Sequence, residues 1–257
     1  MPRIIKPFET EAQIAAQDAA RLLPDPSRRA LLRGAASFGA LALLTGCDVS
    51  DSMSVEKALR AISRFNDKAQ ALLFDPNRLA PTYPESAIAR PFRFNGYYDE
   101  EDAPEVDADD YKLAIGGLVE NKKAWTLEEL YALPQETQIT RLVCVEGWSL
   151  VGKWTGIPLR DFLRRIGADL SANYVYFRCA DRYFTSIDMP TALHPQTQMT
   201  VKFDGATLPR SFGFPLRIRI PTKLGFKNPK YVVELAVINQ YVGGYWENQG
   251  YNWFSGL

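Results

Sequence analysis

Residues 141–149 read RLVCVEGWS, an apolar, strand-like run that ends in Cys144 and continues into a loop containing Gly147. A thiol at the end of a strand is held rigidly and can still face a cavity. A thiolate suits a soft or high-valent metal, and a neighbouring cation such as Arg141 favours the thiolate. The pattern alone does not decide, because a lone cysteine is more often a small buried hydrophobe.

The sequence around Cys144 alternates short apolar runs with Gly, Pro and Asp, which predicts a compact α+β domain over residues 91–257. Strands are expected over residues 111–119, 139–145, 174–179, 198–203 and 231–241. Short helices are expected after the capping box at 126–129, TLEE, and over residues 158–166, where Gly167 ends the helix.

Two local signals add detail to this domain. Asp204-Gly205 predicts a hairpin turn. Residues 216–220, LRIRI, alternate apolar and basic side chains, so one face can enter the core while the two guanidinium groups face something else.

The first 47 residues have the pattern of an export signal. The basic cluster SRRALLR at 27–33 precedes the apolar run 35–46, which is too short to span a bilayer. Its paired arginines resemble a twin-arginine signal, and LTGC, ending in Cys47, resembles a lipobox whose cysteine becomes acylated. The alternatives are a chance Arg-Arg pair before a buried helix, and cleavage nearby with release. We therefore expect a periplasmic protein, either released or lipid-anchored at Cys47.

A linker is predicted over residues 48–90. Within it, residues 54–74 can form an amphipathic helix, because apolar side chains recur at helical spacing at Ala58, Ile62, Phe65, Ala69 and Leu72. We interpret this apolar face as one that packs on the core.

Composition excludes several classes of protein. The 257 residues are 46% hydrophobic and 23% charged with a formal net charge of +0, which argues against disorder and against bulk attraction to nucleic acid. A single histidine and the lack of a Cys-x-x-Cys pair exclude a multi-histidine zinc or haem site. Cys144 and Cys179 could still form a disulfide in an oxidising compartment.

Resemblance to a known family decides how Cys144 is interpreted. CVEGWS at 144–149, followed by WTGIPL at 154–159, is similar to the molybdenum-cysteine motif of the sulfite oxidase superfamily, and most similar to its bacterial periplasmic methionine-sulfoxide reductase catalytic subunits. The likeness extends over residues 92–237. It implies an α+β molybdopterin-binding domain of mixed sheets and short helices, with Cys144 as the metal's protein ligand and Glu146 and Trp148 beside the substrate pocket. We assign Cys144 and Glu146 as catalytic.

The resemblance also implies where the molybdopterin binds. Residues 95–99, NGYYD, look like the family segment that touches the pterin, and residues 213–230 resemble the segment that binds its phosphate. An arginine and spaced lysines supply charge-assisted donors for a phosphate dianion, and Gly225 permits close backbone approach. The residues carried over are Asn95, Tyr98, Asp99, Arg217, Asn228, Pro229 and Lys230.

This chain departs from the family pattern at two positions. Cys179 stands where the family has a threonine near the pterin; we retain it as a cofactor residue because a backbone contact would survive the change. Phe212 stands where an asparagine or histidine usually precedes the glycine, so one polar contact is either lost or made by Ser211.

The resemblance implies two-electron oxygen-atom transfer on a sulfoxide or sulfite-like substrate, small or protein-bound, with a membrane cytochrome b exchanging electrons and no nucleic-acid partner. Because the chain ends soon after Trp253, where sulfite oxidases continue into a dimerisation domain, we expect the reductase-like branch. One alternative is a cofactor-free lipoprotein that acts as a binding or assembly module. Another is a Ser149–His194 hydrolase, although residues 147–151 lack the second glycine of a nucleophile elbow.

Overall fold

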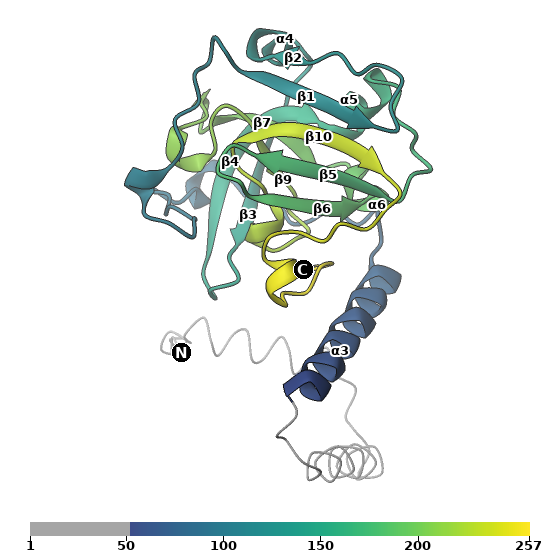
Figure 1. Cartoon of the computed structure of the whole chain (residues 1–257). Coiled ribbons are helices and arrows are strands. Elements are labelled where there is room, and N and C mark those ends of the chain that lie inside the picture. The colour runs from purple at the N-terminus through teal and green to yellow at the C-terminus, as the bar shows by residue number, and fades with distance from the viewer. Residues whose placement is uncertain (1–51) are drawn as a thin grey trace, which may run out of the picture. The chain divides into compact units, whose positions relative to one another are not determined.

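A computed structural model describes residues 52–257 of the chain, with side chains from Leu59 onward (Figure 1). The twin-arginine pattern and Cys47 lie outside the described residues. No helix in the described part is long and apolar enough to cross a membrane. The compact unit Leu59–Leu257 contains two sheets, and it is described here by itself.

The first sheet has the strand order β2-β1-β10-β5-β6 (Figure 1). Its strands are β1 (Lys112–Gly117), β2 (Trp125–Thr126), β5 (Tyr174–Cys179), β6 (Phe184–Asp188) and β10 (Val232–Ile238). β1 runs parallel to β10 and the remaining pairs are antiparallel. The sheet is therefore mixed, as predicted.

The second sheet is antiparallel, with the order β3-β4-β7-β8 and β9 paired to β7. Its strands are β3 (Glu136–Val143), β4 (Ser149–Pro158), β7 (Gln198–Phe203), β8 (Ala206–Thr207) and β9 (Arg217–Arg219). Consecutive strands β3 and β4 form a long hairpin whose loop carries Cys144. The sheet therefore fixes the position of the predicted ligand.

Helices are few and, after the first, short, which with the mixed sheet confirms the predicted α+β class. The α-helices are α3 (Ser52–Leu73), α4 (Leu127–Tyr131), α5 (Leu159–Arg165) and α6 (Met189–Ala192). The 3₁₀ turns are η1 (Glu85–Ala87), η2 (Glu100–Asp102), η3 (Arg210–Phe212), η4 (Gly225–Lys227) and η5 (Glu247–Gln249).

Local signals in the sequence form as predicted. Thr126 accepts a hydrogen bond from the Glu129 amide while the Glu129 side chain accepts one from the Thr126 amide, which completes the capping box of α4. Asp204 and Gly205 both have positive φ, 48° and 86°, as a type I′ hairpin turn between β7 and β8 requires. These elements were predictable because each depends on neighbours in sequence.

The main core lies between the sheets and α5. It combines fully buried residues of both sheets, Leu113, Val175, Leu235, Val201 and Ile218, with Phe162 of α5. A second, smaller cluster consists of Trp154, Phe203 and Leu208, with Phe92 and Phe212 packed against it. Trp154 is entirely buried, and it becomes important below because two arginines stack on it.

The predicted linker differs in part from the expectation. The helix over residues 54–74 forms as α3, but its apolar side chains do not pack on the core: Ile62, Phe65 and Leu72 are 52%, 69% and 86% exposed. The prediction of core packing is therefore wrong for this face. Farther along, the amide of Tyr83 donates to Ile139 O and that of Ala89 to Val151 O, which ties the segment to the β3–β4 hairpin.

Candidate functional site

Cys144 occupies the loop of the β3–β4 hairpin, whose last strand pair joins Val143 to Ser149. Its amide donates to Trp148 O at 2.8 Å, and the Gly147 amide donates back to Cys144 O at 3.2 Å. Gly147 has φ +87°, a conformation that favours glycine. The loop is thus closed by its own backbone, and the half-buried thiol lines a cavity of about 730 Å³.

Most of the predicted site residues meet in this cavity, although they come from three separate segments of the chain. Those that line it are Asn95, Tyr98, Cys144, Glu146, Asn228, Pro229 and Lys230. Asp99, Cys179 and Arg217 do not line it. Sequence reasoning missed Asp181, Tyr183 and Trp246, which come from loops and strand ends without a local motif.

Glu146 is held beside the thiol. Trp148 Nε1 donates to Glu146 Oε2 at 2.9 Å, and the same oxygen lies 3.8 Å from Cys144 Sγ. Arg93 stacks over the Trp148 ring at 4.8 Å, which fixes the indole. The role assigned to Glu146 stays a prediction, but its position at the ligand loop is defined.

Arg141 does not act on the thiol as expected. Its exposed guanidinium stacks over Tyr83 at 5.2 Å, and burial, followed by the negative charge of Glu146, raises the pKa of the Cys144 thiol. The expectation that Arg141 favours the thiolate is therefore wrong. A bound metal cation would favour the thiolate instead.

Three buried cations belong to the site, of which Lys230 lines the cavity and two arginines do not. Arg217, Arg219 and Lys230 are 0%, 1% and 8% exposed, and both guanidinium groups stack over Trp154, at 5.1 and 4.9 Å. Arg217 approaches Asn95 Oδ1 at 3.4 Å, whereas Arg219 donates to Asn228 Oδ1 at 2.5 Å. The two guanidinium groups of residues 216–220 thus face a buried tryptophan and two asparagines of the site.

These cations have acceptors but no neutralising charge. Arg217 donates to Phe212 O and Lys230 to Ser211 O, both at 3.1 Å, and within residues 52–257 neither forms an ion pair with a carboxylate. Arg217 Nε has no hydrogen-bond partner there. Burial lowers the pKa of Arg217 to about 10 and that of Lys230 to about 7. Uncompensated buried cations favour binding of an anion.

The residues present fit a phosphate-bearing metal cofactor. A Cβ on Gly225 would lie 3.2 Å from Val143 O and 3.6 Å from Cys144 Cα, so η4 packs closely against the ligand loop at this glycine. In the described chain no group of three His, Cys, Asp or Glu side chains could hold a metal ion. A metal bound to Cys144 therefore needs further ligands from a cofactor. Cys144, Asn228 and Lys230 at one cavity supply the thiol and the anion donors that such a group requires.

The departure from the family pattern at Phe212 is accommodated by backbone groups. Phe212 packs edge-on against Phe92 and Phe203, with centroids at 5.4 and 4.9 Å, while its carbonyl accepts from Arg217. Ser211 contributes its carbonyl to Lys230. Both cations thus find main-chain acceptors that do not depend on the side chain at position 212.

Cys179 and Asp99 lie at the margin of the site. Cys179 is 2% exposed at the end of β5, and both Cys144 and Cys179 are free, so the alternative of a disulfide between them is wrong. Exposed Asp99 caps η2 through its carbonyl, which accepts from the Asp102 amide at 3.0 Å. The cofactor roles assigned to both residues stay predictions.

Asp181 follows Cys179 closely and does reach the cavity. Tyr98 Oη donates to Asp181 Oδ2 at 2.9 Å, and burial raises the pKa of Asp181. Burial also raises the pKa of Tyr98, which keeps its hydroxyl a donor. This pair places a carboxyl with an increased proton affinity in the pocket wall.

The hydrolase alternative does not fit the geometry. His194 is 1% exposed; its Nδ1 accepts from the Gln196 amide, so Nε2 carries the proton and donates to Arg78 O at 3.1 Å. Burial lowers the pKa of His194. With both ring nitrogens bound to backbone groups, His194 cannot serve Ser149 as a base and has a structural role.

The apoprotein is expected to become more stable as pH rises from 7 to 9. The unfolded chain keeps Lys230 protonated up to a pKa of ~10.4, whereas the folded chain releases that proton at about 7, so the unfolded state binds more protons in between. One such group contributes a slope of about 1.4 kcal/mol per pH unit. Urea unfolding of cofactor-free protein at pH 7 and pH 9 measures this change in the free energy of unfolding.

Lys230→Met should lower this slope by about 1.4 kcal/mol per pH unit and stabilise the apoprotein at pH 7, whereas Lys223, whose pKa burial also lowers to about 7, keeps its own contribution. Lys112→Met, which removes an exposed lysine of β1, should leave the slope unchanged. Equal slopes for wild type and Lys230→Met would show that Lys230 is not an uncompensated cation.

Comparisons with known proteins agree with this geometry. The profile of the oxidoreductase molybdopterin binding domain matches residues 100–246. An Azospira oryzae protein, named as a candidate protein-methionine-sulfoxide reductase subunit (YedZ1), is 59% identical over 242 residues, covering 94% of this chain and 92% of that protein. The protein-methionine-sulfoxide reductase catalytic subunit MsrP of Ralstonia nicotianae is 34% identical over 146 residues. The match covers 51% of this chain and 44% of that protein.

Among solved structures, the sulfane dehydrogenase SoxCD from Paracoccus pantotrophus superposes with a TM-score of 0.51 at 23% identity. The match covers 55% of this chain and 41% of that chain. At this identity the likeness concerns the fold of the domain.

Proposed function

The chain belongs to the oxidoreductase molybdopterin-binding family, and from that premise we propose that it is the catalytic subunit of an exported protein-methionine-sulfoxide reductase. Membership confirms the predicted family, its sulfite-oxidase-type fold and the predicted enzyme class, a molybdenum-dependent oxidoreductase whose cofactor is molybdenum–molybdopterin. The alternative of a cofactor-free binding module is set aside for the same reason. The observation that carries the choice of substrate is the 59% identity over nearly the whole of both chains.

The proposed reaction reduces a sulfoxide. Two electrons and two protons convert the S=O group into a thioether and water. The molybdenum centre, when bound, supplies two-electron chemistry at the sulfur–oxygen bond. The protein's own part is to bind the metal through Cys144, the phosphate through the buried cations and the substrate in the remaining cavity.

An aromatic cluster at the cavity supports a sulfoxide substrate. Tyr97 is 42% exposed and stacks on Tyr245 at 5.2 Å, while Trp246 lies edge-on to Tyr97 at 5.9 Å. Aromatic rings make favourable contacts with sulfur and with apolar methyl groups. A methionine sulfoxide side chain, with one methyl and one S=O group, matches a cavity that combines these rings with polar donors.

The polar wall supplies a proton reservoir for such a reduction. Asp181 lines the cavity, and its raised pKa increases the fraction that carries a proton near neutral pH. Tyr98 donates to it and holds the carboxyl in place. Sulfite oxidation runs in the opposite direction and would release protons rather than take them up.

Export and an external electron donor are further parts of the proposal. The twin-arginine pattern at 28–29 fits a protein that takes up its cofactor before it leaves the cytoplasm. Reduction needs electrons from outside the chain, and we infer that a membrane cytochrome b delivers them. The protein would then be periplasmic, released or anchored at Cys47.

The test is a pair of assays on the full-length, molybdenum-loaded protein. With reduced benzyl viologen as donor, methionine sulfoxide in an oxidised, unfolded protein should be reduced with a higher kcat/KM than sulfite is oxidised with ferricyanide. Free methionine sulfoxide should be reduced with a higher KM. Sulfite oxidation without sulfoxide reduction would overturn the proposal, and protein without molybdenum from cells with an intact cofactor pathway would restore the binding-module alternative.

A further inference from the structure

α3 presents an uncovered apolar face. Its large apolar side chains are strongly exposed at Leu59 (61%), Ile62 (52%), Phe65 (69%), Leu72 (86%) and Leu73 (83%). Leu59, Ile62 and Phe65 are three residues apart and Leu72 follows Phe65 by two turns, so these positions share one side of the helix. Isolated apolar residues are normal on a surface, but a continuous apolar helix face indicates an interaction site.

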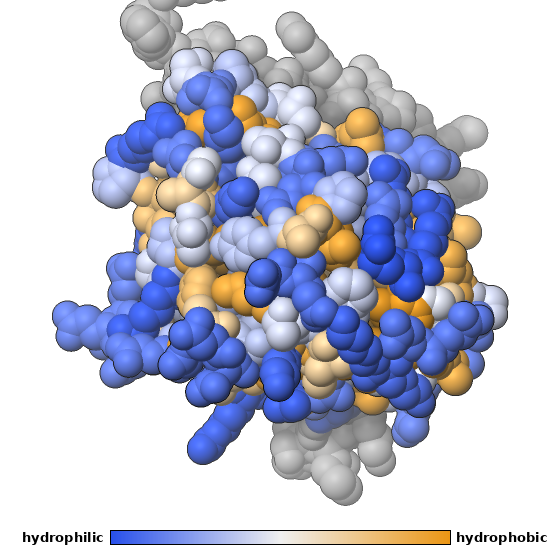
Figure 2. All heavy atoms as spheres, turned by 90° about the horizontal axis from the view of Figure 1, so that it is seen from above, coloured by the Kyte–Doolittle hydropathy of each residue, from blue (hydrophilic) through white to orange (hydrophobic). Residues whose placement is uncertain are grey.

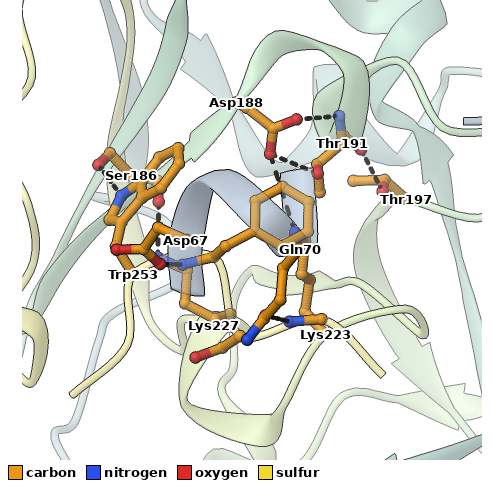
Figure 3. A network of polar contacts seen from close by, with 12 residues as sticks. Asp67, Gln70, Ser186, Asp188, Thr191, Thr197, Lys223, Lys227 and Trp253 are labelled. Carbon is orange, nitrogen blue, oxygen red and sulfur yellow. Dashed lines mark hydrogen bonds and ion pairs between the residues drawn. The ribbon is translucent and has the colours of Figure 1, made fainter. Parts of the chain in front are cut away.

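The opposite face of α3 is already used. Asp67 Oδ1 accepts from the Phe254 amide at 2.6 Å, and Gln70 Oε1 accepts from the Gly256 amide at 3.0 Å (Figure 3). Phe74, just after the helix, packs edge-on against Phe254 at 5.6 Å. Because these bonds hold the polar face on the C-terminal segment, the helix cannot turn its apolar face inward without breaking them.

This attachment is part of a buried polar network. In Figure 3, Lys227 lies beneath the helix among Asp67, Ser186 and Trp253, and it donates to Ser186 O at 2.7 Å. Lys227 and Glu247 form an ion pair in which both side chains are 1% exposed. A rigid base of this kind fixes which side of α3 faces outward.

A row of cations flanks the apolar face. Arg60, Arg64 and Lys68 recur every fourth residue and are exposed. A helix with an apolar face and a basic polar face has the composition of helices that lie in a membrane interface, with the cations near anionic head groups. A groove in a protein partner does not in general require cations beside the apolar residues that it binds.

The expected acylation site lies directly before this helix. Cys47 is separated from the first residue of α3 by residues 48–51 only. Such a stretch spans at most about 18 Å when extended. If Cys47 carries acyl chains in the bilayer, α3 begins at the membrane surface.

We propose that α3 lies in the interface of an anionic phospholipid bilayer, with Leu59, Ile62, Phe65 and Leu72 inserted among the lipids and Arg64 and Lys68 at the head groups. α3 would thus be a second membrane attachment, which fixes the orientation of the domain at the bilayer in addition to any anchoring by lipid at Cys47. The face of the molecule seen in Figure 2 is largely hydrophilic, with apolar residues scattered between charged ones. The proposal rests on the geometry of α3 and does not depend on the proposed reaction.

The test removes the acylation site and measures what remains. Full-length, molybdenum-loaded protein with Cys47→Ser is sedimented with vesicles of phosphatidylcholine alone and of phosphatidylcholine with phosphatidylglycerol. We expect binding to the anionic vesicles at least tenfold above that to the neutral ones, weakened by 0.5 M salt because the cations are screened. Phe65→Asp in this background should lower binding at least tenfold.

Leu118→Asp is the matched control. It also places a carboxylate at an exposed large apolar residue, 42% exposed, but outside α3, and it should bind like the parent. Viologen-linked turnover should be the same in all three proteins, which shows that they are folded. Absence of vesicle binding by the parent, equal binding by Phe65→Asp and the parent, or binding only to vesicles that contain a membrane protein partner would each overturn the proposal.

Discussion

Cys144→Ser is expected to lower sulfoxide turnover by about a thousandfold, which corresponds to ~4 kcal/mol of transition-state stabilisation. The loop around Cys144 is closed by backbone bonds to Trp148 and Gly147, so the substitution should leave the hairpin intact. What changes is the ligand, since a serine must lose its proton to replace a thiolate, and the resulting alkoxide is a harder and far more basic donor. The measurement combines viologen-linked turnover, molybdenum content and the electron paramagnetic resonance signal of Mo(V).

The control for this variant is Ser149→Ala. Ser149 is exposed at the other end of the same loop, where β4 begins, and it pairs with Val143 through the backbone. Turnover of Ser149→Ala should match the wild type. Full activity of Cys144→Ser with an unaltered Mo(V) signal would remove Cys144 as the ligand, and activity lost only in Ser149→Ala would favour the hydrolase.

Arg217→Met should lower molybdopterin content at least tenfold without destabilising the apoprotein. Arg217 does not line the cavity, but it contacts Asn95, which does, so its removal takes away both a nearby positive charge and the hold on that residue. A charge-assisted hydrogen bond contributes about 1.5–3 kcal/mol, which is roughly one to two powers of ten in affinity. Methionine keeps most of the apolar volume over Trp154 and removes a buried cation that has no carboxylate partner in residues 52–257. The apoprotein's melting temperature should therefore stay constant or rise while bound pterin falls.

Lys227→Met provides the opposite pattern. Lys227 is as buried as Arg217, but Glu247 neutralises it, so its removal leaves an uncompensated carboxylate and costs about 3–5 kcal/mol of stability. Thermal unfolding of the two apoproteins, with pterin measured in the loaded forms, separates a cofactor residue from a structural one. A melting temperature that falls equally in both variants would contradict the assignment of Arg217 to the anion site.

Sequence reasoning predicted the elements whose cause is local. The capping box at Thr126, the hairpin turn at Asp204 and the strand over residues 174–179 each depend on neighbours, and all three form. The cavity residues Asn95, Cys144 and Lys230 could be found because they belong to motifs that a resemblance identifies. Their meeting at one cavity could not be derived from spacing.

Other features depend on tertiary structure and were therefore missed. Asp181 and Trp246 reach the cavity from loops, and no periodicity indicates where a loop points. The amphipathic pattern of α3 indicates that one face avoids water but not what covers it, which is why the expectation of core packing was wrong for Phe65. Arg141 was expected beside the Cys144 thiol because the two residues are close in sequence, but successive residues of a strand point to opposite sides.

The parallel pairing of β1 with β10 has a consequence for how the protein is made. Ala114 is in register with Glu234, so the first sheet is completed only after β10, which ends at Ile238, has left the ribosome. Pairings between residues so distant in sequence slow folding, because a large loop must close before any contact stabilises it. Chains truncated before residue 232 would lack the central strand of that sheet and leave β1 and β5 without their common neighbour. Assembly of the cofactor pocket therefore waits for β10 and for the later lining residue Trp246, and a chaperone that holds the unfinished chain would act before any cofactor can bind.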